Sequence, residues 1–390
     1  MDVDAQACLL RYFEQLTDPR AANVSHVLTD MLALTLMAVM CRCDDWQEIA
    51  DWGQAHEPWL KTFLALPHGI PCPDTFERLF ARLDPAELER CFMAFTAAAA
   101  KATGGRLICI DGKTLRRSFD AGGRKAAIHM VSAWCQTNQL VLGQLATEEK
   151  SNEITAIPAL LGLIDVKGAV VSIDAMGCQK AIAQKILDGG GDYLLAVKDN
   201  HKSLHEDVRL YMDEAIKARW AGMEHDEHRD TDADHGRLEK RRCWVTHQVG
   251  WLKRLGHDWP QLRGLVCVES DRQVFGGKRS VERRHYLTSL DPRKCSAEDL
   301  LDYVRGHWEV ENKLHWCLDV SFREDDSRLR KGYGAQNLSR MRRWAMNLLR
   351  PMPALNQPQD KPARKVSLKN KRLMCSWDRD YMLKALTGQK

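Results

Sequence analysis

The sequence predicts an α/β protein in which a helical N-terminal domain is followed by a sheet covered by helices, with a mostly β insertion in the second domain. Three observations predict this class. Apolar residues recur at helical spacing through residues 1–100, strand-like runs begin after Gly104-Gly105 and then alternate with helical segments, and the alternation breaks down over residues 199–290. Strands that pair and then alternate with helices are typical of a sheet with helices packed on it.

Residues 1–100 carry two helix signals. One helix is predicted with Ser25 as its N-cap, because apolar residues follow at i, i+4, i+7 and i+11: Val27, Met31, Leu34 and Ala38. A second is predicted over residues 85–100, where Asp84 is the N-cap and Pro85 is the first helical residue. We therefore expect residues 1–100 to form a helical domain.

Residues 101–350 are expected to form a second domain around a sheet. Runs rich in β-branched and apolar residues predict strands at 106–110, 127–136 and 139–147, the last two joined in a hairpin by Thr137-Asn138. After a further helical segment, the sequence predicts a buried strand at 169–173, a helix at 179–187 and a strand at 193–197.

The segment 199–290 departs from this alternation. After one predicted helix, it holds short strand-like runs at 243–249, 264–269 and 281–290, which indicate a mostly β insertion. Helical spacing returns at Ala297 and continues toward Arg350, where two prolines follow. Residues 351–390 remain as a basic C-terminal tail.

The composition excludes several classes of protein. With 44% hydrophobic and 28% charged residues, the chain has the composition of a soluble globular protein. Its 13 cysteines form no C-x-x-C pair, and it has no G-x-x-x-x-G-K-[ST] phosphate loop, which argues against a zinc ribbon and against ATP use. The longest apolar stretch, residues 31–41, is about half as long as a membrane crossing, and the first residues are acidic. We expect a cytoplasmic protein without a membrane partner.

The charge is unevenly distributed, although the net charge is only +4. From Arg340 to the end of the chain, thirteen Lys and Arg residues stand against three Asp and no Glu. Such clustering is the electrostatic footprint of a polyanion binder. A solvated basic tail is the alternative explanation.

Two aspartates follow apolar strands directly. Asp111 ends the run Leu107-Ile108-Cys109-Ile110, and Asp174 ends the run Val170-Val171-Ser172-Ile173. A carboxylate at the C-terminal edge of a buried strand points to the crevice where α/β sheets place their sites. Each aspartate could instead be a helix cap or a turn residue.

A third carboxylate is selected by helical spacing. Glu311 falls on a stripe at i, i+4, i+7, i+11 and i+14 with Val304, Trp308, His315 and Leu318, which predicts that it faces the core. Glu309 lies on another face with Arg305 and Lys313, where ordinary ion pairs satisfy it. A core-facing acid is costly unless it binds a cation or is paired, for example with Arg328.

Asp111, Asp174 and Glu311 would together form an oxygen-only site, suited to Mg²⁺ or Mn²⁺. Two such ions can support phosphodiester chemistry. Lys113, Arg116 and Arg117 follow the first aspartate and could contact phosphates, or form a solvated basic loop. Arg237, in the turn His235-Gly236-Arg237, could also approach DNA, although a plain surface turn explains it equally.

Four motifs surround these acids. They are Ile110-Asp111-Gly112-Lys113, Lys150-Ser151-Asn152-Glu153-Ile154, Ser172-Ile173-Asp174-Ala175-Met176-Gly177-Cys178-Gln179 and Gly306-His307-Trp308-Glu309-Val310-Glu311-Asn312. In this order they resemble the motifs of the bacterial insertion-sequence transposases that include the H-repeat-associated proteins. The resemblance spans almost the whole chain.

The resemblance implies a ribonuclease H-like catalytic domain with a DDE triad, interrupted by a β insertion before the helix that carries the glutamate. It implies that Asp111, Asp174 and Glu311 are catalytic and bind the metal, Mg²⁺ or Mn²⁺. The implied activity is cleavage of double-stranded DNA at the inverted repeats of the element and strand transfer to target DNA by a homo-oligomer. The helical domain would then serve DNA binding or assembly, and the protein would be associated with the bacterial nucleoid.

One feature departs from the related transposases, which carry a tyrosine, arginine, glutamate and lysine signature around the glutamate. In this chain Val304, His307 and Leu318 stand at the tyrosine, arginine and lysine positions. Phosphate contacts are therefore expected from other residues of this helix: Arg305, Lys313 or His315.

Two other functions are compatible with the same residues. A descendant of a transposase could bind DNA without turnover, and a related metal-dependent nuclease could act on RNA or branched DNA through the same site. Binding alone does not separate these functions, because all of them contact phosphates.

Overall fold

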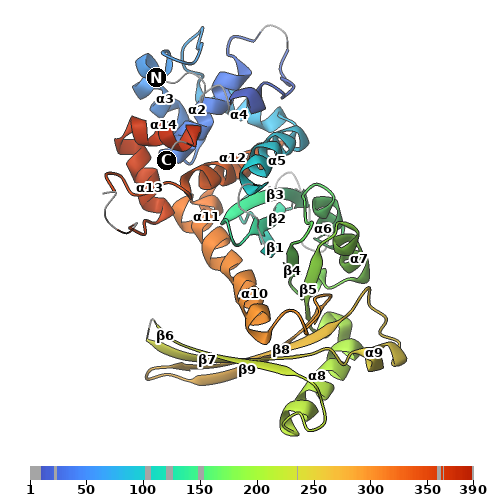
Figure 1. The fold of residues 1–390 in the computed structure, drawn as a ribbon. Helices are drawn as coiled ribbons and strands as arrows, with labels where there is room; N and C mark the ends of the chain where they lie inside the picture. Colours follow the sequence, from blue (N-terminus) through green and yellow to red (C-terminus); the bar gives the residue numbers. More distant parts are fainter. Residues whose placement is uncertain are drawn as a thin grey trace.

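The computed structural model describes most of the chain and arranges it in three parts: a helical layer, a central sheet and a β arm (Figure 1). The described residues are 10–21, 24–101, 107–119, 126–147, 153–234, 236–357, 362 and 364–388. Within these ranges, we find no helix with the length and apolar character that a membrane span requires.

The helical layer contains the N-terminal helices α2 (Leu28–Met40), α3 (Trp46–Leu60), α4 (Pro73–Arg82) and α5 (Pro85–Lys101). Helix α5 begins as predicted, with Pro85 first and the Asp84 side chain accepting from the backbone N–H of Ala86. Helix α2 begins later than predicted. Its N-cap is Val27, which makes no side-chain cap hydrogen bond, so Ser25 is not the cap.

Three helices from the other end of the chain complete this layer: α12 (Gly334–Leu349), α13 (Leu368–Trp377) and α14 (Arg379–Thr387). Figure 1 shows them beside α2 and α5. Trp344 of α12 is fully buried, with its ring against Phe13, Phe92 and Phe95. The N-terminal helices therefore share one core with the C-terminal helices.

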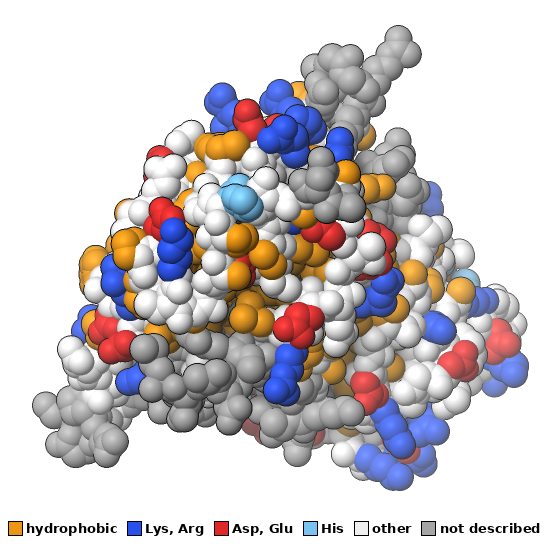
Figure 2. Space-filling model, turned by 90° about the horizontal axis from the view of Figure 1, so that it is seen from above, with side chains coloured by type: hydrophobic (Ala, Val, Ile, Leu, Met, Phe, Trp, Pro, Cys, Tyr) orange, Lys and Arg blue, Asp and Glu red, His pale blue; other side chains and the backbone are white. Residues whose placement is uncertain are grey.

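The C-terminal basic residues are partly interior, which corrects the view of a solvated tail or an open polyanion site. Arg372 of α13 is 1% exposed, pairs with Asp44 at 2.8 Å and lies over the ring of Phe322. The other buried basic residues of this region are Arg340, Arg342, Arg343 and Lys371. On the face of the molecule in Figure 2, Lys and Arg side chains are interspersed with Asp, Glu and hydrophobic side chains. Tertiary packing turned these charges inward, where Arg340, Arg343 and Arg372 pair with acids and Arg342 and Lys371 donate to backbone carbonyls.

The central sheet has the strand order β3-β2-β1-β4-β5. Strands β1 (Leu107–Thr114), β2 (His129–Cys135) and β3 (Leu140–Thr147) form an antiparallel meander, while β4 (Val170–Ile173) and β5 (Asp192–Val197) continue parallel to β1. Helices α6 (Glu153–Leu161) and α7 (Lys180–Asp188) lie on one face of this sheet (Figure 1). The short 3₁₀ turns η2 (Ala175–Gly177) and η3 (Asp199–His201) follow β4 and β5.

The β arm extends the same sheet. After α8 (Lys202–Lys217), it contains β6 (Asp226–Asp234), β7 (Arg237–Thr246), the short helix α9 (Gly250–Arg254), β8 (Gly264–Val274) and β9 (Arg279–Thr288). Strand β9 pairs with β5, so the nine strands form one sheet that ends with the order β5-β9-β8-β7-β6. The arm is therefore joined to the central sheet by backbone hydrogen bonds.

A long helical segment crosses the other face of the central sheet. It consists of α10 (Ala297–Glu309), the π-helical turn η4 (Val310–His315) and α11 (Trp316–Ser321), and the 3₁₀ turn η5 (Glu324–Asp326) follows it. A capping box of Ser296 and Asp299 starts α10. Gly306 allows close approach to β1, because a Cβ there would lie 2.5 Å from Cδ2 of Leu107. This close packing brings the motif around Glu311 to the sheet.

Candidate active site

The two predicted aspartates lie side by side at the C-terminal edge of the sheet. Strands β1 and β4 are parallel with Ile110 opposite Ile173, so Asp111 and Asp174 follow at equivalent positions. Asp174 ends β4 as predicted, but β1 continues through Asp111 to Thr114, where it stays paired with β2. Two residues earlier, Cys109 donates to the Gly306 carbonyl and Ser172 contacts His307. Because alternate strand residues share a face, both aspartates lie on the face covered by α10.

Glu311 reaches the same region from the π-helical turn, but for a different reason than the sequence indicated. The predicted stripe faces the core only at its ends, where Val304 and Leu318 are buried, whereas Glu311 is exposed and Trp308 is 39% exposed. Within the π turn, Val310 and Leu314 are the buried positions. The π turn changes the angular spacing of the residues, which a straight-helix analysis misses.

The three carboxylates line one cavity of about 400 Å³. His307 stands among them: burial lowers the pKa of its imidazole, and the charges of Asp111, Asp174 and Glu311 act in the opposite direction. Its Nδ1 lies 2.9 Å from Oγ of Ser172. The cavity therefore brings together residues from β1, β4 and the long helical segment that are about 60 to 200 positions apart in the sequence.

Asp111 is held in its ionised form. Its Oδ2 lies 3.0 Å from Nε2 of His315, and its Oδ1 accepts from the backbone N–H of Gly112 at 2.9 Å. Burial raises the pKa of Asp111, but the hydrogen bond and charge of His315 outweigh burial, and the net shift is downward. His315, predicted as a phosphate contact, is here a partner of the first aspartate.

The donor set suits Mg²⁺ or Mn²⁺, because all three side chains offer carboxylate oxygens. Asp174 also accepts from the backbone N–H of Met176 at 3.1 Å, so it caps η2 as well as facing the cavity. Across the described residues, no three His, Cys, Asp or Glu side chains lie close enough to hold a metal ion as they stand. Metal binding by Asp111, Asp174 and Glu311 therefore requires these side chains to come closer together.

Lys113 does not lie where a phosphate contact was expected. It is 8% exposed, and its Nζ lies 2.7 Å from Asp319, 2.8 Å from Asp325 and 3.6 Å from Glu324. Burial lowers the pKa of Lys113, but these acids outweigh burial and raise it. The strand turns Lys113 inward, toward these acids and away from solvent.

Arg116 and Arg117 follow in the loop after β1 and remain accessible. Their side chains are 78% and 46% exposed, and they lie near Asp325 and Asp326 at 3.2 and 3.9 Å. Exposed ion pairs of this kind are weak, so both guanidinium groups can exchange an acidic partner for a phosphate.

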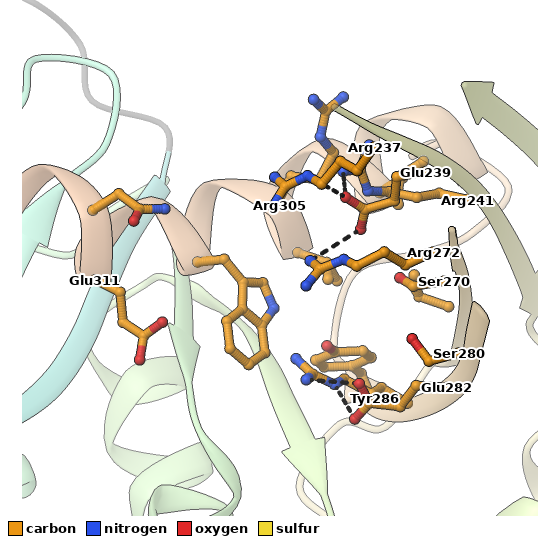
Figure 3. Close-up of a pocket in the computed structure, with 16 residues that line it drawn as sticks. Arg237, Glu239, Arg241, Ser270, Arg272, Ser280, Glu282, Tyr286, Arg305 and Glu311 are labelled. Atoms are coloured by element: carbon orange, nitrogen blue, oxygen red, sulfur yellow. Dashed lines mark hydrogen bonds and ion pairs between the residues drawn. The ribbon is translucent and has the colours of Figure 1, made fainter. Parts of the chain in front are cut away.

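A second cavity, of about 450 Å³, adjoins the first where the arm meets α10, and Figure 3 shows its arginines facing Glu311 across this space. Arg237 and Arg305, both predicted as DNA contacts, line it and are 44% exposed. They are paired with acids: Arg237 lies 3.9 Å from Glu239, and Arg305 lies 3.0 Å from Asp230. Lys313 lies outside this cavity and pairs with Glu309 at 2.8 Å, as the helical spacing indicated.

Three arginines of this second cavity are not predicted from the sequence: Arg241, Arg272 and Arg284. Arg284 lies over the ring of Trp308, 3.9 Å from its centre, between the two cavities. Period-two alternation along β7 would have placed Arg241 on the same face as Arg237. The pairing of β7 with β8, which adds Arg272, is not visible in the sequence.

The second motif lies mostly outside the described residues, since only Glu153 and Ile154 are described. Glu153 is buried and forms an ion pair with Nε2 of His129. Nδ1 of His129 lies 2.9 Å from the hydroxyl of Thr114 in β1. Glu153 therefore packs, through His129, on the face of β1 opposite to the one on which Asp111 lies.

Comparisons with known proteins agree over almost the whole chain. Residues 102–348 match the family "Transposase DDE domain", and residues 10–96 match the family "DDE_Tnp_1-associated". The chain is 40% identical over 363 residues to "Putative transposase YncI" of Escherichia coli O157:H7, an alignment that covers 92% of each protein. It is 36% identical over 384 residues to "H repeat-associated putative transposase YhhI" of Escherichia coli K12, covering 97% of this chain and 98% of the relative.

Among solved structures, the chain is similar to a piggyBac transposase synaptic complex with hairpin DNA. That alignment covers 98% of this chain and 82% of the other, with 10% sequence identity and a TM-score of 0.41.

Proposed function

Since the chain belongs to the DDE transposase family, we propose that it cleaves the ends of an insertion sequence and transfers the freed strand to target DNA. Asp111, Asp174 and Glu311 are its catalytic carboxylates. The observation that supports this most is that these three acids, chosen from the sequence, line one cavity.

The architecture supports the same proposal. The order β3-β2-β1-β4-β5, with the third acid on a helical segment after a β insertion, agrees with the ribonuclease H-like domain that the motifs imply. Asp111 lies within β1 and Asp174 directly follows β4, and the two strands are adjacent and parallel up to Ile110 and Ile173.

The proposed metal ligands are Asp111, Asp174 and Glu311. When bound there, Mg²⁺ or Mn²⁺ supplies activation of the attacking oxygen and stabilisation of the leaving oxygen in phosphodiester cleavage. The contact of Asp111 with His315 keeps the carboxylate ionised and oriented. Ser172 contacts one nitrogen of His307 and thereby fixes the imidazole among the three acids.

Proposed DNA contacts surround this cavity. Arg116 and Arg117 are exposed after β1, while Arg237 and Arg305 line the adjoining arm cavity. Lys313 is more enclosed, with its Nζ on Glu309. Assembly of several copies on the two element ends belongs to the same proposal, with the helical layer as the candidate assembly region.

The experiment is cleavage of DNA that carries the element's own ends, with the purified full chain and Mg²⁺. We expect Asp111→Asn to abolish cleavage and to leave DNA affinity unchanged, because the substitution removes one charge and little volume. Asp165→Asn, in the loop before β4, is the matched control and should cleave as the unaltered protein does.

The alternatives give different results in the same assay. A DNA-binding descendant would bind the ends and cleave nothing with either metal. A nuclease would cleave RNA or branched DNA better than the element ends. Loss of DNA binding by Asp111→Asn would indicate that this residue has a structural role.

A further inference from the structure

Two contacts join the long helical segment to strand β1 near the cavity. Nε2 of His315 lies 3.0 Å from Oδ2 of Asp111, and Nζ of Lys113 lies 2.7 Å from Oδ1 of Asp319. Glu311, His315 and Asp319 are four residues apart on the helical segment, and Asp111 and Lys113 are two residues apart on the strand.

These spacings match. Two strand residues span about 6.6 Å, and four helical residues rise about 6 Å, so consecutive turns of the helix meet alternate residues of the strand. The side chain one turn before His315 is Glu311, which lines the cavity with Asp111 and Asp174. A displacement of the helix by one turn would break both contacts and move Glu311 away.

We propose that Lys113 and Asp319 form a positioning pair that sets the register of the helical segment against β1 and so holds Glu311 opposite Asp111 and Asp174. The inference rests on the proposed function and adds to it residues that touch neither DNA nor metal. Lys113 positions the helical segment, although its place beside a catalytic aspartate suggested that it contacts a phosphate.

The surroundings of Lys113 support a fixed anchor. Its Nζ also lies 2.8 Å from Asp325 and 3.6 Å from Glu324, both in η5. Glu324 is bound in turn by Arg343 of α12 at 2.9 Å, and both of these side chains are fully buried. The pair is therefore built into a network that joins β1, the end of the helical segment and α12.

The π turn explains why an anchor is needed at this place. Before the turn, α10 is fixed on the sheet by the close packing of Gly306 on Leu107. The turn Val310–His315 then changes the angular phase of the helix: Val310 and Leu314 are buried, but Glu311 is exposed and is not itself fixed by core packing. Contacts on the C-terminal side of the turn are therefore required to hold Glu311 in place.

The test compares Asp319→Asn, Lys113→Met and Lys113→Arg in the full chain with Lys331→Met. Lys331→Met is the matched control. It removes the surface ion pair of Lys331 with Glu77, whose side chains are 61% and 38% exposed. Three quantities are measured: hydrogen exchange of residues 310–321, Mn²⁺ binding by calorimetry without DNA, and affinity for element-end DNA without metal. Asp319 is 31% exposed, so Asp319→Asn gives a folded variant even if Lys113→Met does not fold.

We expect Asp319→Asn and Lys113→Met to increase exchange over residues 310–321 at least tenfold and to weaken Mn²⁺ binding at least tenfold. DNA affinity should stay within twofold, Lys113→Arg should restore part of the Mn²⁺ binding, and Lys331→Met should change none of the three.

The inference is overturned if exchange in 310–321 is unchanged, whatever the cleavage results are. It is also overturned if Lys113→Met binds element-end DNA more weakly and the slope of its affinity against salt concentration decreases by about one counterion. That result would mean that Lys113 contacts a phosphate. If Asp319→Asn and Lys113→Met had a lower melting temperature but bound Mn²⁺ with unchanged affinity, the pair would have only a structural role. Failure of the unaltered chain to cleave would refute the proposed function, while the exchange result would still decide the positioning role.

Discussion

Three consecutive residues of β1 have three different roles. Asp111 faces the cavity, Gly112 points to the opposite face, and Lys113 returns to the first face and pairs with acids. Gly112 has no side chain because the buried pair of His129 and Glu153 occupies that space. The alternation of a strand thus lets one short motif contribute both to the site and to its support.

Gly112→Ala should destabilise the protein by about 1–3 kcal/mol, because the added methyl group has no room. A Cβ at this position would overlap Nε2 of His129 and lie 2.5 Å from Oε1 of Glu153. Denaturant unfolding measures the change. Gly250→Ala, where nothing lies within 4 Å of the added Cβ, should leave stability unchanged or slightly higher. Equal unfolding midpoints for the two variants would contradict this account.

At the scale of elements, β9 joins the arm to the central sheet and carries a buried histidine. His285 is 2% exposed, and within the described part of the chain neither ring nitrogen has a hydrogen-bond partner. Burial lowers the pKa of His285 to about 4, with His205, Arg283 and Arg209 acting in the same direction and Asp213 opposing. The folded state therefore keeps this imidazole neutral at pH values where the unfolded chain is protonated.

The free energy of unfolding should fall as the pH decreases from about 6.5 to about 4. Over that range the unfolded chain gains a proton at His285 and the folded chain does not, which removes up to roughly 3 kcal/mol of stability. His285→Leu should remove this contribution, so its stability should decline less than that of the unaltered protein. Urea unfolding at pH 7, 5.5 and 4.5 measures it, and parallel curves would refute the assignment.

Over the whole molecule, the helical layer depends on both ends of the chain. Trp344 and Arg372 come from the last fifty residues, yet Trp344 completes the core around Phe13 and Phe92, and Arg372 binds the Val39 carbonyl. The central sheet lies between these two chain ends in the sequence. The helical layer is therefore completed only when α12 and α13 pack against the N-terminal helices.

Trp344→Ala should cost about 3–5 kcal/mol, because it leaves a large cavity in a core built from both chain ends. Trp377→Ala is the matched control, since that side chain is 70% exposed and its loss should change stability by less than about 0.5 kcal/mol. Thermal unfolding followed by near-UV circular dichroism compares the two. If Trp344→Ala melted only the N-terminal helices while the sheet stayed folded, the layer would be an independent domain.

The sequence alone supported some elements much better than others. The strands of the central sheet and Asp174 at the end of β4 were predictable, because a buried strand shows as a continuous apolar run, whereas β1 continues past Asp111 to Thr114. Glu311 was selected through a helical stripe that the π turn invalidates, so the residue was selected on an incorrect argument. The arginines of the arm could not be grouped, because strand pairing brings residues such as Arg241 and Arg272 together.

By itself, the sequence determined the α/β class, the resemblance to the family that the comparisons show, and the position of Asp174 at the end of β4. These features depend on neighbours within a few residues, where alternation and turn chemistry act. Only the tertiary structure decided that Lys113 and Arg372 face inward and that Glu311 lines the same cavity as the two aspartates. Partners such as Asp319 and Asp44 lie more than 200 residues away, and the energy of burying a charge depends on those distant partners.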